Sequence, residues 1–336
     1  MHQTFPDSID HKCSNLEEPK FKIIPNVEHI IYMVSQTGPD FREADHIVSQ
    51  LSFALTEKGY NVGILEINFR ESIYVHEYFV CRSKVHRSND SWIPQEVLSK
   101  NDLKNGGSLK LISTGLIKDS ECDLNSFRGI EKKKLINQLT YDVVWSTDQP
   151  LNFLLITTPA GSFGESHLME ETKHLTQLDG AIVVINSESV GTSGPNFLTN
   201  FCKKNSIKIL GIIEDNRNKD TCNCGCCTGA WSIEPIEGIS TLCEQLNINL
   251  LGAACDVRDW MAPADYIDEE HEKECMINYF TMYGDNYIPM QDILAKLIEL
   301  NYLPRLNGND FIVQKKSKNE SDLDLYKIFR KLFAQR

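Results

Sequence analysis

The chain has 336 residues, of which 41% are hydrophobic and 24% charged, so it is long enough for one large α/β domain or two small ones. Its 34 Lys and Arg against 47 Asp and Glu leave a formal net charge of −13, which argues against nucleic acid and anionic membranes as partners and favours a protein or a cation. No apolar run approaches the length of a membrane span. The chain has 11 cysteines, and its first residues are polar and contain no apolar signal segment. We therefore expect a soluble protein of a reducing compartment, the cytoplasm.

The pattern of hydrophobic residues divides the chain into three parts. Residues 1–26 contain three prolines and no periodicity, which predicts a flexible tail. Residues 27–268 alternate strand-length apolar runs with stretches of helical spacing, which predicts a doubly wound α/β domain with a mainly parallel sheet. The predicted strands are 27–34, 62–67, 109–112, 153–157, 180–186, 207–213 and 249–253, and the predicted helices are 44–55, 132–139, 169–177, 197–202 and 239–246.

The last part, residues 269–336, is predicted to be a C-terminal extension. It contains an amphipathic helix at 293–298, a hairpin signal at Asn307-Gly308 within 302–313, and a final helix at 325–333. Two interpretations stay open for it: a small interaction module resembling a winged helix, or an extension packed on the main domain.

Four cysteines lie within six residues, in the run Cys222-Asn223-Cys224-Gly225-Cys226-Cys227, hereafter the cysteine run. Ionised thiols this close repel one another, and a soft cation or a metal cluster is the usual means of holding them. Cys224 and Cys227 form a C-x-x-C pair, but the chain offers no second such pair at zinc-finger distance. Two chains that each donate one pair would supply enough ligands. A disulfide or ordinary thiols remain the alternatives.

The predicted strand 207–213 delivers the chain to the cysteine run. Loops at the carboxyl ends of parallel strands are where α/β proteins place their sites. The cysteine run therefore lies where a functional site is expected.

Several further stretches match, in chain order, the motifs of one family. They are Glu57-Lys58-Gly59-Tyr60-Asn61-Val62-Gly63-Ile64-Leu65-Glu66 for K-K-G-Y-x-V-G-L-L-D, Trp92-Ile93-Pro94 for W-V-P, Phe127-Arg128-Gly129 for W-R-G-P, residues 153–167 for L-L-I-D-x-P-P-G-T-x-D-E-H, Lys208-Ile209-Leu210-Gly211-Ile212-Ile213-Glu214 for K-I-L-G-V-V-E, and Gly252-Ala253-Ala254-Cys255-Asp256 for G-x-I-P-L-D. The chain thus resembles the Mrp/ApbC-type P-loop proteins, a family that includes cytosolic iron-sulfur assembly scaffolds.

The resemblance implies a nucleotide-binding fold that dimerises face to face and shares one 4Fe-4S cluster between a C-x-x-C pair from each subunit. Cys224 and Cys227 are the first choice for that pair, and Cys222 and Cys226 are the substitutes. The implied function is an assembly scaffold and carrier that passes the cluster to acceptor proteins. The implied partner is an identical chain or a related scaffold subunit.

The phosphate-binding loop departs from the family pattern G-K-G-G-V-G-K-[S/T]. In residues 35–46 only Gly38 remains of the glycines, both lysines are missing, and Asp40, Glu43 and Asp45 stand where a triphosphate would lie. At about 4 Å each like-charge contact costs roughly 1 kcal/mol in water and about 4 at a protein surface.

A degenerate nucleotide site would consist of Gly38, Glu66 and Gly161. The family Asp at the position of Thr157, which helps to hold magnesium, is also lost. We therefore expect that ATP hydrolysis is lost and that Mg-ATP, if it binds, does not bind tightly. The alternatives are an active ATPase that drives cluster transfer, and a cluster-free regulatory pseudo-NTPase that pairs with an intact family member.

Three histidines are interpreted as ordinary polar groups. His46 opens a predicted helix and is expected to face solvent, and His76 and His86 are expected on the surface because no ligand spacing surrounds them.

Overall fold

The computed structural model describes the parts of the chain that form the central sheet and the helices packed on it. The described residues are 23–35, 43–69, 75–79, 81, 83–88, 91–117, 129–146, 148–157, 175, 177–186, 193–215, 237–254, 276–277 and 288–303. Residues 1–22 of the predicted tail, the cysteine run, Gly38, Gly161, the predicted hairpin after Leu303 and the predicted helix 325–333 lie outside them. The last residues of the predicted tail are not flexible, since Ile24 is buried and its backbone exchanges hydrogen bonds with the Gln177 side chain.

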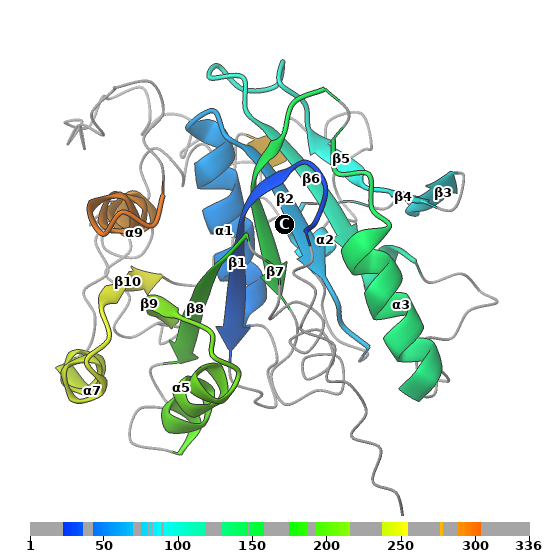
Figure 1. Ribbon diagram of the computed structural model, residues 1–336. Helices are drawn as coiled ribbons and strands as arrows, with labels where there is room; N and C mark the ends of the chain where they lie inside the picture. The colour runs from blue at the N-terminus through cyan, green and yellow to red at the C-terminus, as the bar shows by residue number, and fades with distance from the viewer. Residues whose placement is uncertain are drawn as a thin grey trace, which may run out of the picture.

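A central sheet of eight strands organises the molecule, in the order β10-β9-β8-β1-β7-β2-β6-β5 (Figure 1). Neighbouring strands are parallel throughout, except that β5 runs antiparallel to β6 at one edge. The strands are β1 Val27–Ser35, β2 Asn61–Glu66, β5 Gln95–Leu98, β6 Ser108–Ser113, β7 Leu151–Thr157, β8 Leu178–Asn186, β9 Ile209–Asp215 and β10 Leu250–Ala254. The predicted mainly parallel α/β fold is confirmed.

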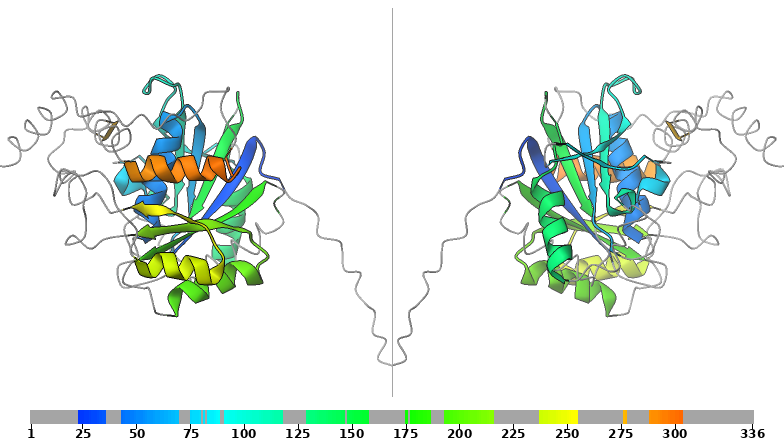
Figure 2. Two further views of the ribbon diagram at one scale, coloured as in Figure 1. Left: turned by 90° about the vertical axis from the view of Figure 1, so that its left-hand side faces the viewer. Right: turned by 90° about the vertical axis from the view of Figure 1, so that its right-hand side faces the viewer.

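Helices cover both faces of the sheet (Figure 2). The first face carries α1 (Glu43–Glu57), α2 (Val75–Tyr78) and α9 (Ile288–Glu299). The second face carries α3 (Gly129–Tyr141), α5 (Gly194–Lys204) and α7 (Glu237–Leu246). The central strands are buried on both sides, which explains why their sequences are nearly continuous apolar runs instead of alternating ones.

Two glycines are needed where α1 ends and where β2 packs closely against its neighbours. Gly59 has a φ of 96° just after α1, where a residue of left-handed conformation ends the helix. Gly63 lies within β2, and a Cβ there would come within 2.6 Å of the Leu151 side chain and 2.9 Å of the Trp145 ring. Because Gly63 has no side chain, the Trp145 ring can pack in the hydrophobic core between the sheet and the helices of the second face.

Helix α1 is buried along most of its length although it carries many polar residues. Three of its hydroxyl groups donate to carbonyl oxygens of the preceding turn: Ser49 to Asp45 at 2.8 Å, Ser52 to Ser49 at 3.0 Å and Thr56 to Ser52 at 2.8 Å. These hydrogen bonds satisfy the three hydroxyls inside the helix itself, which offsets their loss of contact with water when they are buried.

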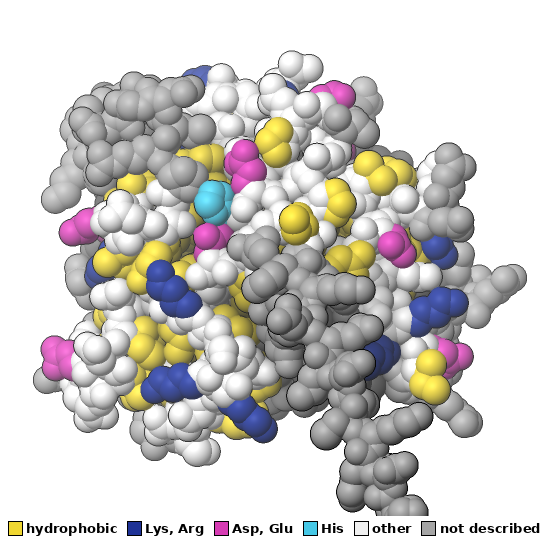
Figure 3. Space-filling model, in the orientation of Figure 1, with side chains coloured by type: hydrophobic (Ala, Val, Ile, Leu, Met, Phe, Trp, Pro, Cys, Tyr) yellow, Lys and Arg dark blue, Asp and Glu magenta, His cyan; other side chains and the backbone are white. Residues whose placement is uncertain are grey.

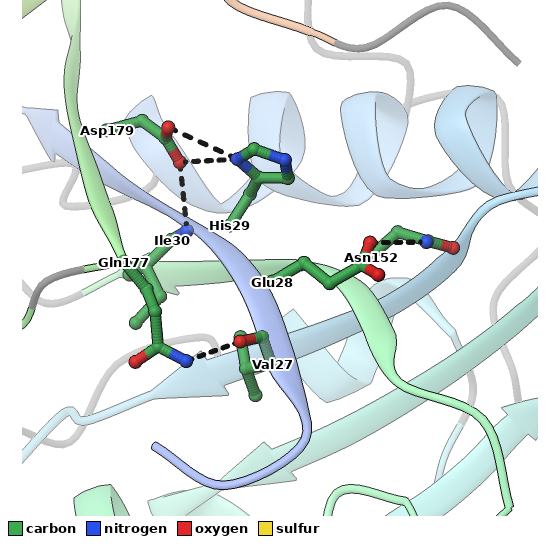
Figure 4. A network of polar contacts seen from close by, with 7 residues as sticks. All are labelled: Val27, Glu28, His29, Ile30, Asn152, Gln177 and Asp179. Atoms are coloured by element: carbon green, nitrogen blue, oxygen red, sulfur yellow. Dashed lines mark hydrogen bonds and ion pairs between the residues drawn. The ribbon is translucent and has the colours of Figure 1, made fainter. Parts of the chain in front are cut away.

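A polar network holds the amino ends of β1, β7 and β8 together (Figure 4). The His29 ring lies with its Nδ1 3.1 Å from Asp179 Oδ2, and the same carboxylate accepts from Ile30 N at 3.2 Å. Asn152 donates to Glu28 Oε2 at 2.8 Å. This network lies at the amino ends of the strands. The functional site is expected at the opposite edge of the sheet, where the strands have their carboxyl ends.

Helix α9 belongs to the same hydrophobic core as α1 and the first face of the sheet. Its apolar residues Ile293, Leu294 and Leu297 are 0% exposed within that core. The Lys208 ammonium lies 4.5 Å from the centre of the Tyr302 ring, which joins the turn after α9 to the start of β9. The described part of 269–336 therefore packs on the main domain, whereas the division of the chain at residue 268 stays a prediction.

Some elements were not predicted, and one prediction is only partly tested. The hairpin β3 (His86–Ser88) and β4 (Ser91–Ile93), the edge strand β5 and the single-turn α2 all come from the polar stretch between β2 and β6. The predicted helix 169–177 lies mostly outside the described residues, and its last described residues, Leu175 and Gln177, are not helical.

Exposed large hydrophobic residues are scattered over different parts of the described surface. They are Ile23, Ile93, Ile130 and Phe197. Figure 3 shows hydrophobic side chains alongside lysine or arginine near α5 and α7. Exposed apolar residues that occur singly are normal on soluble domains and mark no interface by themselves. None of the helices in the described part of the chain combines the length and apolar character needed to cross a bilayer.

Candidate functional site at the carboxyl ends of the strands

Buried polar residues collect where the parallel strands end. The register places Thr157 opposite both Met33 and Glu66, Glu66 opposite Ser113, and Asn186 opposite Asp215. Carboxyl ends of parallel strands share one edge, so these side chains form one polar rim around the start of α1. The buried polar residues of this rim are Ser35, Glu66, Ser113, Thr157, Asn186, Glu214 and Asp215.

Glu66, predicted to be part of a degenerate nucleotide site, is held by its own chain. Its side chain is 1% exposed, and its Oε2 accepts from Ser113 Oγ at 2.6 Å and from the Val75 amide at 3.1 Å. A buried carboxyl group needs such partners to offset its removal from water. The carboxylate of Glu66 therefore fastens α2 and β6 to the end of β2. Its suggested partners Gly38 and Gly161 lie outside the described residues.

His76 takes part in the same cluster, so the expectation that it lies on the surface is wrong. It is half-buried at the start of α2, and its Nδ1 lies 3.2 Å from Ser113 Oγ. The sequence carried no signal for this contact, because β6 and α2 are separated by more than thirty residues and α2 is a single turn.

His46 is also placed differently from its prediction. Instead of facing solvent it is 0% exposed, and its Nε2 lies 3.2 Å from Oδ1 of Asp215, which is also 0% exposed. The first turn of α1 was expected to contact water, but the helix is buried from Asp45 onward. A buried contact between an imidazole and a carboxylate therefore joins the start of α1 to the end of β9.

The cysteine run follows β9 in a connection, residues 216–236, that lies outside the described residues and returns to them at α7. The sequence placed this run after a strand of the parallel sheet, and β9 is that strand, located between β8 and β10. Among the described residues, no three His, Cys, Asp or Glu side chains are grouped closely enough to hold a metal ion.

The described cysteines are thiols of the interior or its margin and not ligands of an exposed site. Cys81 is half-buried, while Cys202 and Cys243 are buried. Burial raises the pKa of the Cys243 thiol from 9.0 to about 11, with Lys296 opposing the rise and Glu214 adding to it. Near pH 8 such a thiol is ionised in about one molecule in a thousand. Cys243 therefore has little thiolate to offer a metal or an alkylating reagent.

Comparison with known proteins gives a consistent result. A family model described as "ParA: NUBPL iron-transfer P-loop NTPase" matches residues 26–273. A protein named cytosolic Fe-S cluster assembly factor CFD1, from Candida albicans, is 34% identical over 293 residues, which cover 85% of this chain and 97% of that protein. The cytosolic Fe-S cluster assembly factor NUBP2 homolog of Nematostella vectensis is 31% identical over 219 residues, covering 65% and 77%.

Among solved structures, a nucleotide-binding protein from Archaeoglobus fulgidus, in complex with ADP, superposes with a TM-score of 0.51. The two chains are 16% identical, and the superposition covers 84% of this chain and 95% of the other. At this level of identity the likeness establishes the fold alone.

Proposed function

Since the chain belongs to the family of NUBPL iron-transfer P-loop NTPases, matched over residues 26–273, we propose that it is a cytosolic scaffold and carrier of iron–sulfur clusters whose own ATP hydrolysis has been lost. Its cargo is a 4Fe-4S cluster that it holds between two chains and passes to acceptor proteins. The observation that carries the proposal is the run of four cysteines in the connection that begins at the carboxyl end of β9, because α/β proteins place their sites at that edge of the sheet.

The ligands are proposed to be Cys224 and Cys227 from each of two chains, with Cys222 and Cys226 as the substitutes. Four thiolates complete the ligand set of a 4Fe-4S cluster, and two chains related by a two-fold axis supply two each. The second chain is an identical copy or a related scaffold subunit. Two of the described cysteines do not compete, since Cys202 and Cys243 are buried in the core of the second face.

Three features support the loss of hydrolysis. The loop after β1 has neither of the family's lysines, so no ammonium neutralises a transferred phosphoryl group. Thr157 ends β7 where the family has an aspartate, and a hydroxyl brings no charge for magnesium. The Oε2 atom of Glu66 accepts hydrogen bonds from Ser113 and Val75, so this carboxylate already serves to hold α2 and β6.

Anaerobic reconstitution with ferrous iron and sulfide tests the scaffold function. We expect about two irons and two sulfides per chain and the broad visible absorption of a 4Fe-4S centre. Protein that takes up no iron and sulfide under these conditions would leave the regulatory pseudo-NTPase as the better account. Zinc recovered in place of iron would show instead a metal site of a different kind.

Turnover of Mg-ATP by the same preparations tests the loss of hydrolysis. We expect phosphate release no faster than in a blank without protein, both for the apo chain and for the loaded one. A rate above that blank that disappears when residues 36–42 are replaced would show that the chain is an active ATPase.

A further inference from the structure

Helix α5 carries apolar side chains on two sides, although the fold uses only one of them. The helix lies beside α7 on the second face of the sheet (Figures 1 and 2). Leu198 and Cys202 are buried in the core of that face, whereas Phe197 lies outside the core and is 54% exposed. Burial of an aromatic ring is a large favourable contribution to folding, which Phe197 realises only in part. Its exposure is therefore a feature that the packing of the domain does not explain.

Phe197 is one of two neighbouring rings on this helix. Phe201 follows one turn later, and the two rings stack with their centroids 6.4 Å apart and an interplanar angle of 26°. Phe201 is half-buried and packs against the core of the second face, so it anchors the pair to the domain. Single exposed apolar residues are ordinary, but two stacked rings one turn apart present a contiguous apolar surface.

The last turn of α5 adds positive charge beside the two rings. Lys203 and Lys204 are exposed, and no carboxylate among the described residues forms an ion pair with either of them. The helix contains no Asp or Glu. Lysines in a last turn stabilise the helix through its dipole, which by itself indicates no partner. Lys204, however, lies two turns after Phe197 and one turn after Phe201, so charge and rings share one side of the helix.

The end of α5 is fixed by its own chain, so the outer side of the helix is ordered without a partner. The backbone amide of Asn205 and its Nδ2 both donate to the Phe201 carbonyl oxygen, at 3.1 and 2.9 Å. Ser206 then takes a left-handed φ of 58° and turns the chain toward β9. A surface that is already ordered loses little conformational entropy on binding. The rings and lysines are therefore arranged to bind a partner.

We propose that the outer side of α5, formed by Phe197, Phe201, Lys203 and Lys204 and hereafter the α5 surface, binds a segment of another protein that carries carboxylates and large apolar side chains. The apolar side chains of that segment pack against the two rings, and its carboxylates pair with the lysines. Charge complementarity selects this partner. A second copy of this chain that used the same surface would bring lysines against lysines. The inference goes beyond the proposed function and does not depend on iron or on the cysteine run.

Selection from a phage library of random peptides, about 15 residues long, tests the inference with the apo protein. We expect the selected peptides to combine Asp or Glu with large apolar residues, and their affinity, measured by fluorescence anisotropy, to fall as salt is added. Phe197→Ser should weaken binding about tenfold or more, because it removes a central apolar contact. The double variant Lys203→Glu and Lys204→Glu keeps both rings and should also weaken binding about tenfold.

Ile130→Ser is the matched control. Ile130 is 86% exposed on α3 and is followed by three lysines at 132–134, so it resembles the α5 surface in composition but lies on another helix. This variant should bind the selected peptides within about twofold of the parent. Urea unfolding of all variants shows whether each is folded, and because the lysine variant leaves both rings in place, the test does not depend on Phe197→Ser alone.

Other outcomes would overturn the inference. Peptides that bind Phe197→Ser as tightly as the parent would show that they use a different surface, and a selection without enrichment would show that the α5 surface binds no such segment. Basic or purely apolar peptides that depend on Phe197 would contradict the proposed chemistry of the partner. An apo parent that is dimeric while Phe197→Ser is monomeric would assign the surface to contact between two copies. Failure of the proposed function is seen separately, in the reconstitution with iron and sulfide.

Discussion

Replacing both Cys224 and Cys227 by serine is expected to reduce reconstituted iron and sulfide to background. A serine hydroxyl does not ionise near neutral pH and is a hard oxygen donor, so it cannot replace a thiolate on a 4Fe-4S cluster. Without two of its ligands from each chain the cluster has no stable site. Iron and acid-labile sulfide assays on anaerobically reconstituted protein measure the effect.

Two further variants make this result specific. Cys222 and Cys226 replaced together should keep most of the iron, since they are the substitutes and not the first choice. Cys81→Ser, at a half-buried thiol in a different part of the fold, should keep all of it. If instead the Cys222/Cys226 variant loses the iron and the Cys224/Cys227 variant keeps it, the ligand pair is wrongly assigned. If both double variants keep all of their iron, the cysteine run does not bind the cluster.

Shortening Leu297 to alanine is expected to lower the free energy of unfolding by about 2–5 kcal/mol. Leu297 is 0% exposed in α9 and belongs to the core shared by α1 and the first face of the sheet. Truncating it removes apolar contacts and leaves a cavity that a packed helix cannot fully close. The midpoint of urea unfolding, read by circular dichroism, measures the change.

The matched control for that variant lies on the same helix. Glu299 is exposed at the end of α9, and Glu299→Ala should change the free energy of unfolding by no more than about 0.5 kcal/mol. Equal midpoints for the two variants would mean that α9 does not share the stability of the main domain. The part of the chain after residue 268 would then be better described as a separate unit.

The parallel sheet could be predicted because its strands are buried on both faces. Residues such as Ile182, Val183 and Val184 all point into one core or the other, so no polar residue interrupts the run, and the strand is visible in the sequence. The edge elements could not be predicted in the same way. Strand β5, with the sequence Gln-Glu-Val-Leu, is short and partly exposed, and its pairing with β6 depends on a turn that periodicity does not show.

The strands that end at the polar rim were predicted, but the contacts within the rim were not. Glu66 lies at the end of β2 within the predicted strand 62–67, because the order of strands and loops is readable from the sequence, whereas the place of the cysteine run stays a prediction. The buried state of His46 was not predicted, because a polar residue near a helix start usually faces water, and Asp215, the carboxylate 3.2 Å from its Nε2, lies 169 residues away in a strand. Contacts of this kind depend on how α1 lies on the sheet, which hydrophobic spacing leaves undetermined.

The mass of the reconstituted protein under non-denaturing, anaerobic conditions tests the central claim most directly. We expect a species of two chains that carries one 4Fe-4S cluster, and lighter, iron-free chains in its place when Cys224 and Cys227 are both serine. A cluster carried by a single chain, or a two-chain species that forms equally well without iron and never binds it, would contradict the account.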